Sequence, residues 1–281
     1  MLDRKLCLSY NKNMEILKKH KKIIILIFLV AGIFLWCKGC TDKAHFTPNW
    51  EKKDISGVLA KEKLTAADYK FLSAQTGLSK TAIDDFLSSG KPDEITAFQN
   101  QYFKRCEYDT ESVFFPVVMT EVRRKPTKIA SVKKGDVLVS LTTYTLGFRH
   151  GHAGIVLDGE TGKTLESTEL GEVSSIGNLQ SWKYYPTFAI LRCKDEELAA
   201  KAADYAEKNL IGVSYNPFAG VFGKDKSGEK PVSSTQCAHI VWQAYKAVGA
   251  DIDGNGGIFV FPGDFLKSDL FEIVQIYGIA P

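Results

Sequence analysis

Cys237 is the residue of this 281-residue chain whose surroundings most clearly favour nucleophilic chemistry. It lies in the segment SSTQCAHIVWQAY, at the start of a helix that apolar spacing predicts over residues 238–248. A helix N-terminus presents unpaired N–H groups and the positive end of the helix dipole, and both stabilise a thiolate. Such a thiolate could attack a carbonyl carbon while neighbouring N–H groups bind the oxyanion. From position alone, a small buried cysteine that packs the helix start is an equally good interpretation.

A histidine must take the thiol proton, and the pair His150 and His152 is the best candidate source. Residues i and i+2 of an extended strand share a face, so both imidazoles could point into one pocket. His239 is nearer to Cys237 in sequence, but residues two apart on a helix point in different directions. We therefore expect His239 to contact the core or the helix surface. A zinc site at the His-x-His pair is a minor alternative, because no Cys-x-x-Cys or His-Glu-x-x-His pattern accompanies it.

Glu166 and Glu169 are the two acids that could orient the base, and they lie on opposite faces of the strand that follows a predicted hairpin turn. If a three-residue loop follows Asp158, Glu166 lies diagonally from His152 on the same face. If Asp158 pairs with Lys163 instead, Glu169 is the acid that faces this histidine. Spacing alone leaves both registers open.

The segment DIDGNG, residues 251–256, resembles part of a calcium-binding loop. Positions one, three, five and six fit, but position twelve is Pro262 where a bidentate glutamate is required, and no following helix is evident. We interpret the segment as a glycine-rich turn, with calcium as a minor alternative, and expect neither a metal ion nor a cofactor.

The elements that must position these residues fall into two groups. Residues 64–105 contain three helical patterns that begin near Thr65, Ser79 and Pro92. From about residue 133 the chain contains the β-rich runs DVLVSL, AGIVLD, KTLES, TFAILR and FEIVQIY, with a further helix predicted over 195–209. Strands gathered before the last helix predict an α+β fold with an antiparallel sheet.

The charge of the chain is concentrated at its N-terminus. Residues 1–40 hold eight Lys or Arg and two acids, which is +6, so the remainder carries 3 − 6 = −3. A domain with a net negative charge is a poor candidate for binding nucleic acid, because it repels the phosphates. The apolar run 23–37 follows the basic run KKHKK, and we expect a membrane anchor that keeps this basic flank in the cytoplasm. A cleaved signal, or a lipidated Cys40, are the alternatives.

Composition and cysteine content narrow the class of protein further. A hydrophobic share of 44% and a charged share of 25% exclude a disordered, a collagen-like or a multi-span membrane protein. The exported body contains three cysteines, Cys106, Cys193 and Cys237, and this odd number requires that at least one be free or pair with another chain. Whether Cys106 and Cys193 form a disulfide is open.

The order of these motifs resembles the circularly permuted NlpC-type papain-like cysteine hydrolases, the YiiX-like group. The matching segments, over about residues 133–275, are GDVLVS, GHAGIVLD, TLEST, GVSY and CAHIVWQAY. The resemblance implies a permuted papain-like domain with a C-terminal nucleophile helix. It assigns Cys237, His152 and Glu166 to catalysis and selects Glu166 over Glu169. The chain departs from the family at the nucleophile, where QCAHI replaces YCSEL, and this affects the expected substrate preference more than catalysis.

The expected function is that of an exported, membrane-anchored cysteine hydrolase that cleaves amide bonds in cell-wall peptides. A lipid acyl hydrolase or acyltransferase on the same fold, and a non-catalytic binding module, are the alternatives. We assign substrate contacts to Tyr215, Gln236 and His150. The expected organisation is a basic flank over 1–22, an anchor over 23–37, a linker over 38–56, a helical segment over 57–130 and the hydrolase domain over 131–281.

Overall fold

The structure is a computed structural model that describes residues 20–33, 45–114, 118–219, 232–257 and 259–280. At its centre is a six-stranded sheet in which every neighbouring pair is antiparallel, with the order β12-β9-β3-β6-β7-β8. The fold is therefore α+β with antiparallel sheets, as predicted. The strands that form the sheet are β3 (Val137–Ser140), β6 (His152–Asp158), β7 (Lys163–Glu166), β8 (Ser175–Asn178), β9 (Phe188–Cys193) and β12 (Phe271–Tyr277).

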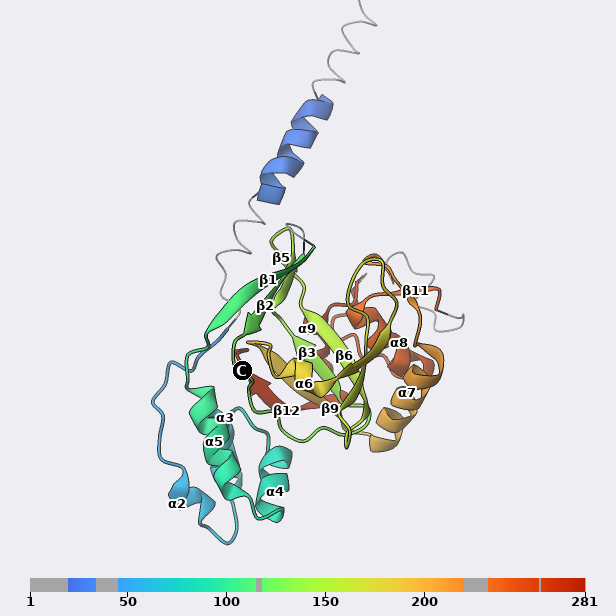
Figure 1. Ribbon diagram of the computed structural model, residues 1–281. Helices are drawn as coiled ribbons and strands as arrows, with labels where there is room; N and C mark the ends of the chain where they lie inside the picture. The colour runs from blue at the N-terminus through green and yellow to red at the C-terminus, as the bar shows by residue number, and fades with distance from the viewer. Residues whose placement is uncertain (1–19, 34–44, 115–117, 220–231, 258, 281) are drawn as a thin grey trace, which may run out of the picture.

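Helices cover both faces of this sheet, and each face has its own hydrophobic core. Along β3, Val137 and Val139 pack on the side of α7 (Glu196–Asn209) and α8 (Cys237–Ala247), whereas Leu138 packs on the opposite side. Because both faces are buried, the central strands are continuous apolar runs rather than alternating ones. Figure 1 shows α7 and α8 together on one side of the body.

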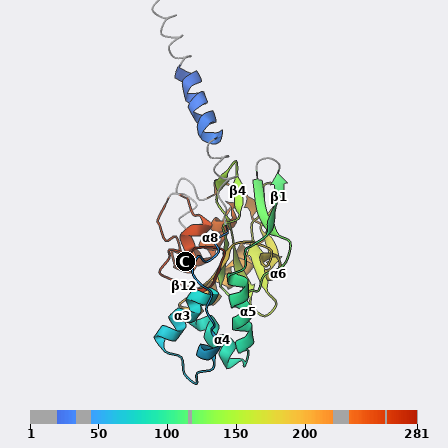
Figure 2. The same ribbon diagram turned by 90° about the vertical axis from the view of Figure 1, so that its left-hand side faces the viewer.

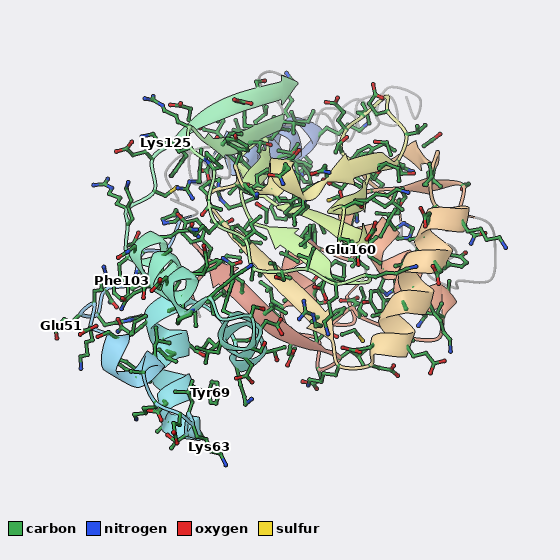
Figure 3. All side chains as sticks on the ribbon, turned by 60° about the horizontal axis from the view of Figure 1, so that its bottom comes forward. Glu51, Lys63, Tyr69, Phe103, Lys125 and Glu160 are labelled. Atoms are coloured by element: carbon green, nitrogen blue, oxygen red, sulfur yellow. The ribbon has the colours of Figure 1, made fainter. Side chains whose placement is uncertain are left out.

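The second helical layer consists of α3 (Ala66–Thr76), α4 (Lys80–Ser88) and α5 (Pro92–Tyr102), preceded by the single turn α2 (Ser56–Leu59). Each of the three begins where the sequence predicts. Thr65 forms a capping box with Asp68, Ser79 accepts a hydrogen bond from the Ala82 N–H, and Pro92 occupies the first turn. Figure 2 shows these helices together at the end of the body opposite helix 20–33, and Figure 3 labels Tyr69 and Phe103 within this layer.

The predicted helical segment 57–130 is helical only as far as Tyr102. Beyond it, β1 (Tyr108–Phe114) and β2 (Val118–Arg123) form a hairpin that joins β4 (Thr143–Thr145) and β5 (Phe148–Arg149) in a second sheet. The boundary at residue 130 therefore divides a hydrogen-bonded sheet. The helical layer also shares a core with strands of the central sheet, so 57–130 and 131–281 are parts of one packed unit.

The described part of the predicted linker is attached to the body. The His45 ring nitrogen Nδ1 is 2.6 Å from the Pro186 carbonyl, and the Phe46 N–H donates to the Gly278 carbonyl at 2.6 Å. Residues 20–33 are helical with exposed side chains. The rest of the predicted anchor, 34–37, and most of the basic flank lie outside the described residues. In the part of the chain that is described, no helix is both long and apolar enough to cross a membrane.

Candidate active site

Three residues that the sequence assigns to catalysis meet where the central sheet adjoins α8. His152 is the first residue of β6, Glu166 is the last residue of β7, and Cys237 is the first residue of α8. Helix α8 packs against β6, as Figure 1 shows. Residues far apart in sequence are thus brought together by one strand pair and one helix start.

The register of the β6–β7 hairpin combines the two predicted alternatives, one on each side of a β-bulge. Asp158 pairs with Lys163, the register expected to turn Glu169 toward His152. Yet a β-bulge at Leu157 shifts the pairing by one residue, so that Glu166 lies opposite Gly154. Glu166 therefore shares the face of His152, as the family resemblance implies, and Glu169 lies beyond the end of β7.

Glu166 and His152 form a buried hydrogen-bonded pair. The Nε2 atom of His152 is 2.7 Å from Oε2 of Glu166, and the two residues are 6% and 8% exposed. The other carboxylate oxygen, Oε1, accepts hydrogen bonds from the Thr164 hydroxyl at 2.6 Å and from the Trp182 indole N–H at 3.0 Å. Both oxygens of the carboxylate thus have donors, which a buried charge requires.

The site favours the charged forms of this pair. Burial alone lowers the pKa of His152, but hydrogen bonds to Cys237 and Glu166 outweigh it and raise this pKa to about 10. Burial alone raises the pKa of Glu166, but the hydrogen bond and charge of His152 hold it below its ordinary value. At neutral pH the site therefore contains an imidazolium next to a carboxylate.

Cys237 hydrogen-bonds to His152 and is 7% exposed. Because Nε2 of this ring bonds to Glu166, the remaining nitrogen, Nδ1, is the one available to the thiol. As the first helical residue, Cys237 also has an N–H that no carbonyl within the helix can accept. The sulfur thus has the His152 ring as a hydrogen-bond partner and also lies at a helix N-terminus.

Gln236, a predicted substrate contact, has a structural role at this helix start. Its side-chain oxygen accepts hydrogen bonds from the Ala238 N–H at 2.8 Å and from the Cys237 thiol at 3.5 Å. Its amide nitrogen donates to the Val260 carbonyl at 3.1 Å. Both ends of the amide have partners within the chain, so the side chain caps α8 and orients the sulfur.

Tyr215, the second predicted substrate contact, lies within electrostatic range of Cys237. Tyr185 lies there as well, with its ring 6.2 Å from that of His152. Burial raises the pKa of both tyrosines, so their hydroxyls keep their protons at neutral pH. The sequence prediction missed Tyr185, Thr164 and Trp182. The only sequence signal for Tyr185 and Trp182 was the group of aromatic residues just before TFAILR.

The other two histidines considered as partners of the thiol, His150 and His239, bond to other groups. His150, the third predicted substrate contact, bonds to the Thr145 hydroxyl and the Gly151 carbonyl, each at 2.9 Å. Gly151 adopts a left-handed φ of 81°, which breaks the strand alternation expected to align His150 with His152. His239 is fully buried against Thr235 and Trp242, which confirms the prediction that it contacts the core.

The three cysteines of the described body, Cys106, Cys193 and Cys237, are all free thiols. Among the described residues, no three His, Cys, Asp or Glu side chains gather as metal ligands would.

Comparisons with models of protein families, with curated proteins and with solved structures find no match. The geometry of the site is therefore the basis for any functional inference. A thiol, a buried imidazolium–carboxylate pair and a helix N-terminus are the groups that covalent acyl transfer requires.

Proposed function

We propose that this protein is a cysteine hydrolase in which Cys237 is the nucleophile, His152 carries the proton and Glu166 orients the imidazole. The observation that carries the proposal is the buried 2.7 Å hydrogen bond between His152 and Glu166, next to a thiol at a helix start. A buried charged pair is costly to maintain, and active sites are where such pairs with strongly shifted pKa values concentrate.

In this mechanism His152, which hydrogen-bonds to the thiol, takes the proton of Cys237. The thiolate attacks the carbonyl carbon of an amide, and the N–H of Cys237 binds the oxyanion that forms. The imidazolium then protonates the leaving amine. Water, deprotonated by the neutral ring, hydrolyses the acyl-enzyme and restores the thiol.

We further propose that the fold is of the permuted papain-like type and that the enzyme acts outside the cytoplasm on peptide amides of the cell wall. The succession of β3, β6, β7 and the nucleophile helix α8 supports the family resemblance. The exposed apolar side chains of residues 23–33, together with the preceding basic run, support attachment to a membrane.

A second candidate substrate class is acyl lipids, and one observation favours it. Leu146 and Phe148, on the β4–β5 hairpin that leads into His152, have half-exposed apolar side chains. Exposed apolar groups near an active site can bind an acyl chain.

A thiol-reactive probe tests the proposed nucleophile. We expect iodoacetamide to label Cys237 of the full-length protein selectively, and the labelling to fall sharply in His152→Ala. Cys193→Ala is the matched control, because this thiol is also free and buried but its pKa is raised by burial. If Cys237 is labelled slowly and at the same rate in the wild type and in His152→Ala, the protein is a non-catalytic binding module and not a cysteine hydrolase.

A substrate panel then distinguishes the two enzyme classes. Muropeptides and phospholipids are incubated with the full-length protein, with Cys237→Ala as the control. Release of new amines identifies an amidase, and release of fatty acids identifies an acyl hydrolase. Product formed equally by the Cys237→Ala variant would refute the mechanism.

A further inference from the structure

We infer that Trp182 is a positioning residue of this site, which holds the Glu166 carboxylate with its indole N–H and the His152 ring with its face. The inference rests on the proposed function, because it concerns the groups that activate Cys237. It adds a fourth side chain, from a segment that no sequence motif includes.

The chain fixes Trp182 at the end of the short helix α6 (Leu179–Trp182). The Asn178 side chain caps this helix by accepting the Gln180 N–H at 2.8 Å, and the Leu179 N–H donates to the Gly162 carbonyl at 2.8 Å. The first bond fixes the start of α6, and the second ties the helix to the turn between β6 and β7. Trp182 is 1% exposed, so its indole N–H needs a partner inside the protein.

That partner is the carboxylate that holds the imidazole. The indole nitrogen lies 3.0 Å from Oε1 of Glu166, whereas His152 bonds to Oε2. The same indole stacks on the His152 ring, with centroids 5.3 Å apart and planes inclined by 21°. One rigid side chain therefore contacts both members of the pair, which fixes their relative orientation.

The space around the indole is shaped for these contacts. A Cβ added to Gly154 would lie 3.2 Å from Cζ2 of Trp182 and 3.0 Å from Cγ of Glu166. Glycine at this position of β6 thus lets the indole and the carboxylate approach the strand together. A tryptophan that only filled the core would not need its N–H directed at a buried charge.

The electrostatic consequence is specific to this role. The indole N–H stabilises the ionised Glu166 and contributes to the lowered pKa of this acid. A firmly ionised Glu166 in turn stabilises the His152 imidazolium. Loss of the N–H should therefore lower the His152 pKa, and with it the pH at which the imidazolium beside Cys237 loses its proton.

Trp182→Phe tests the inference, since phenylalanine keeps a ring beside His152 but removes the N–H. We expect the pH dependence of iodoacetamide labelling of Cys237 in the full-length protein to reflect a His152 pKa about one unit lower than in the wild type, as for loss of a hydrogen bond to a charged group. The matched control is Trp242→Phe, which removes the indole N–H of another buried tryptophan, bonded to the exposed Asp251. This control should leave the pH profile unchanged.

A second measurement separates this inference from the proposed function. In a Cys237→Ala background, 15N-histidine NMR of the full-length protein, which has five histidines, follows the His152 pKa without any catalysis. Trp182→Phe should lower this pKa by about one unit, and Trp242→Phe should not change it. An unchanged pKa and an unchanged labelling profile would overturn the role of Trp182. An unreactive Cys237 in the wild type with a lowered His152 pKa in Trp182→Phe would overturn the proposed function alone.

Discussion

Replacing Gly177 with alanine should disable the site without altering any residue that performs chemistry. Gly177 lies on β8, opposite Thr164 of β7. A Cβ at this position would lie 2.3 Å from Oε1 of Glu166 and 2.7 Å from the Thr164 hydroxyl oxygen. The backbone itself does not oppose alanine, because Gly177 is not among the positive-φ glycines. The effect is therefore purely steric.

The magnitude follows from these distances. Ordinary contact begins at 3.4 Å, so the carboxylate must move by 3.4 − 2.3, about 1 Å. Such a movement disrupts the 2.6 Å bond from Thr164 and the 3.0 Å bond from Trp182. A misplacement of about 1 Å in a catalytic group can lower a rate by roughly 100-fold, and overpacking costs about 1–3 kcal/mol of stability.

The assay is the rate at which iodoacetamide labels Cys237, measured together with the thermal unfolding of the same samples. We expect Gly177→Ala to label 10- to 100-fold more slowly at neutral pH, on the order of the cost of such a misplacement. Gly57→Ala is the control, because a Cβ there meets no atom within 4 Å. A Gly177→Ala protein that is folded and labels at the wild-type rate would refute the reasoning that Glu166 must be held in this position.

The remaining predictions concern stability and its pH dependence. The His152–Glu166 pair should stabilise the fold most between about pH 4.5 and 6.5, because the lowered pKa of Glu166 contributes fully above 4.5 and the raised pKa of His152 contributes fully below 6.5. The difference in unfolding free energy between the wild type and Glu166→Gln should then shrink as the pH rises toward 10, and a constant difference would contradict this. His239→Gln should lower the unfolding free energy by about 1–3 kcal/mol, because it disturbs the buried hydrogen bonds of this ring. The pH profile of Cys237 labelling should stay unchanged. An altered profile would show that His239 takes part in the site. Leu146 adopts a φ of 48° in an exposed turn, a conformation that asparagine tolerates better than leucine. Leu146→Asn should therefore raise the unfolding free energy by about 1 kcal/mol, as measured by chemical denaturation. A loss of stability would show that the turn is not strained.

Local signals explain what could be predicted of the fold. Thr65, Ser79 and Pro92 begin helices because their side chains act on the backbone of the next few residues. The central strands could be identified because strands buried on both faces are apolar throughout. The hairpin over 108–123 was missed, because its strands mix polar and apolar residues and β2 pairs with β4, which follows later in the chain.

The candidate site likewise has features that local sequence predicts and features that depend on contacts between distant segments. The sequence by itself determined that a cysteine begins a helix, that a histidine begins a strand and that an acid follows a hairpin, since each of these depends on short-range pattern. Residue spacing left both acids open, and the tertiary structure decided which one meets His152, because the β-bulge at Leu157 reverses the result that the Asp158–Lys163 pairing would otherwise give. Only the tertiary structure placed Trp182 against both Glu166 and His152. Contacts between distant segments depend on how all the strands of the sheet pair and pack. The local spacing of residues in the chain does not specify this pairing.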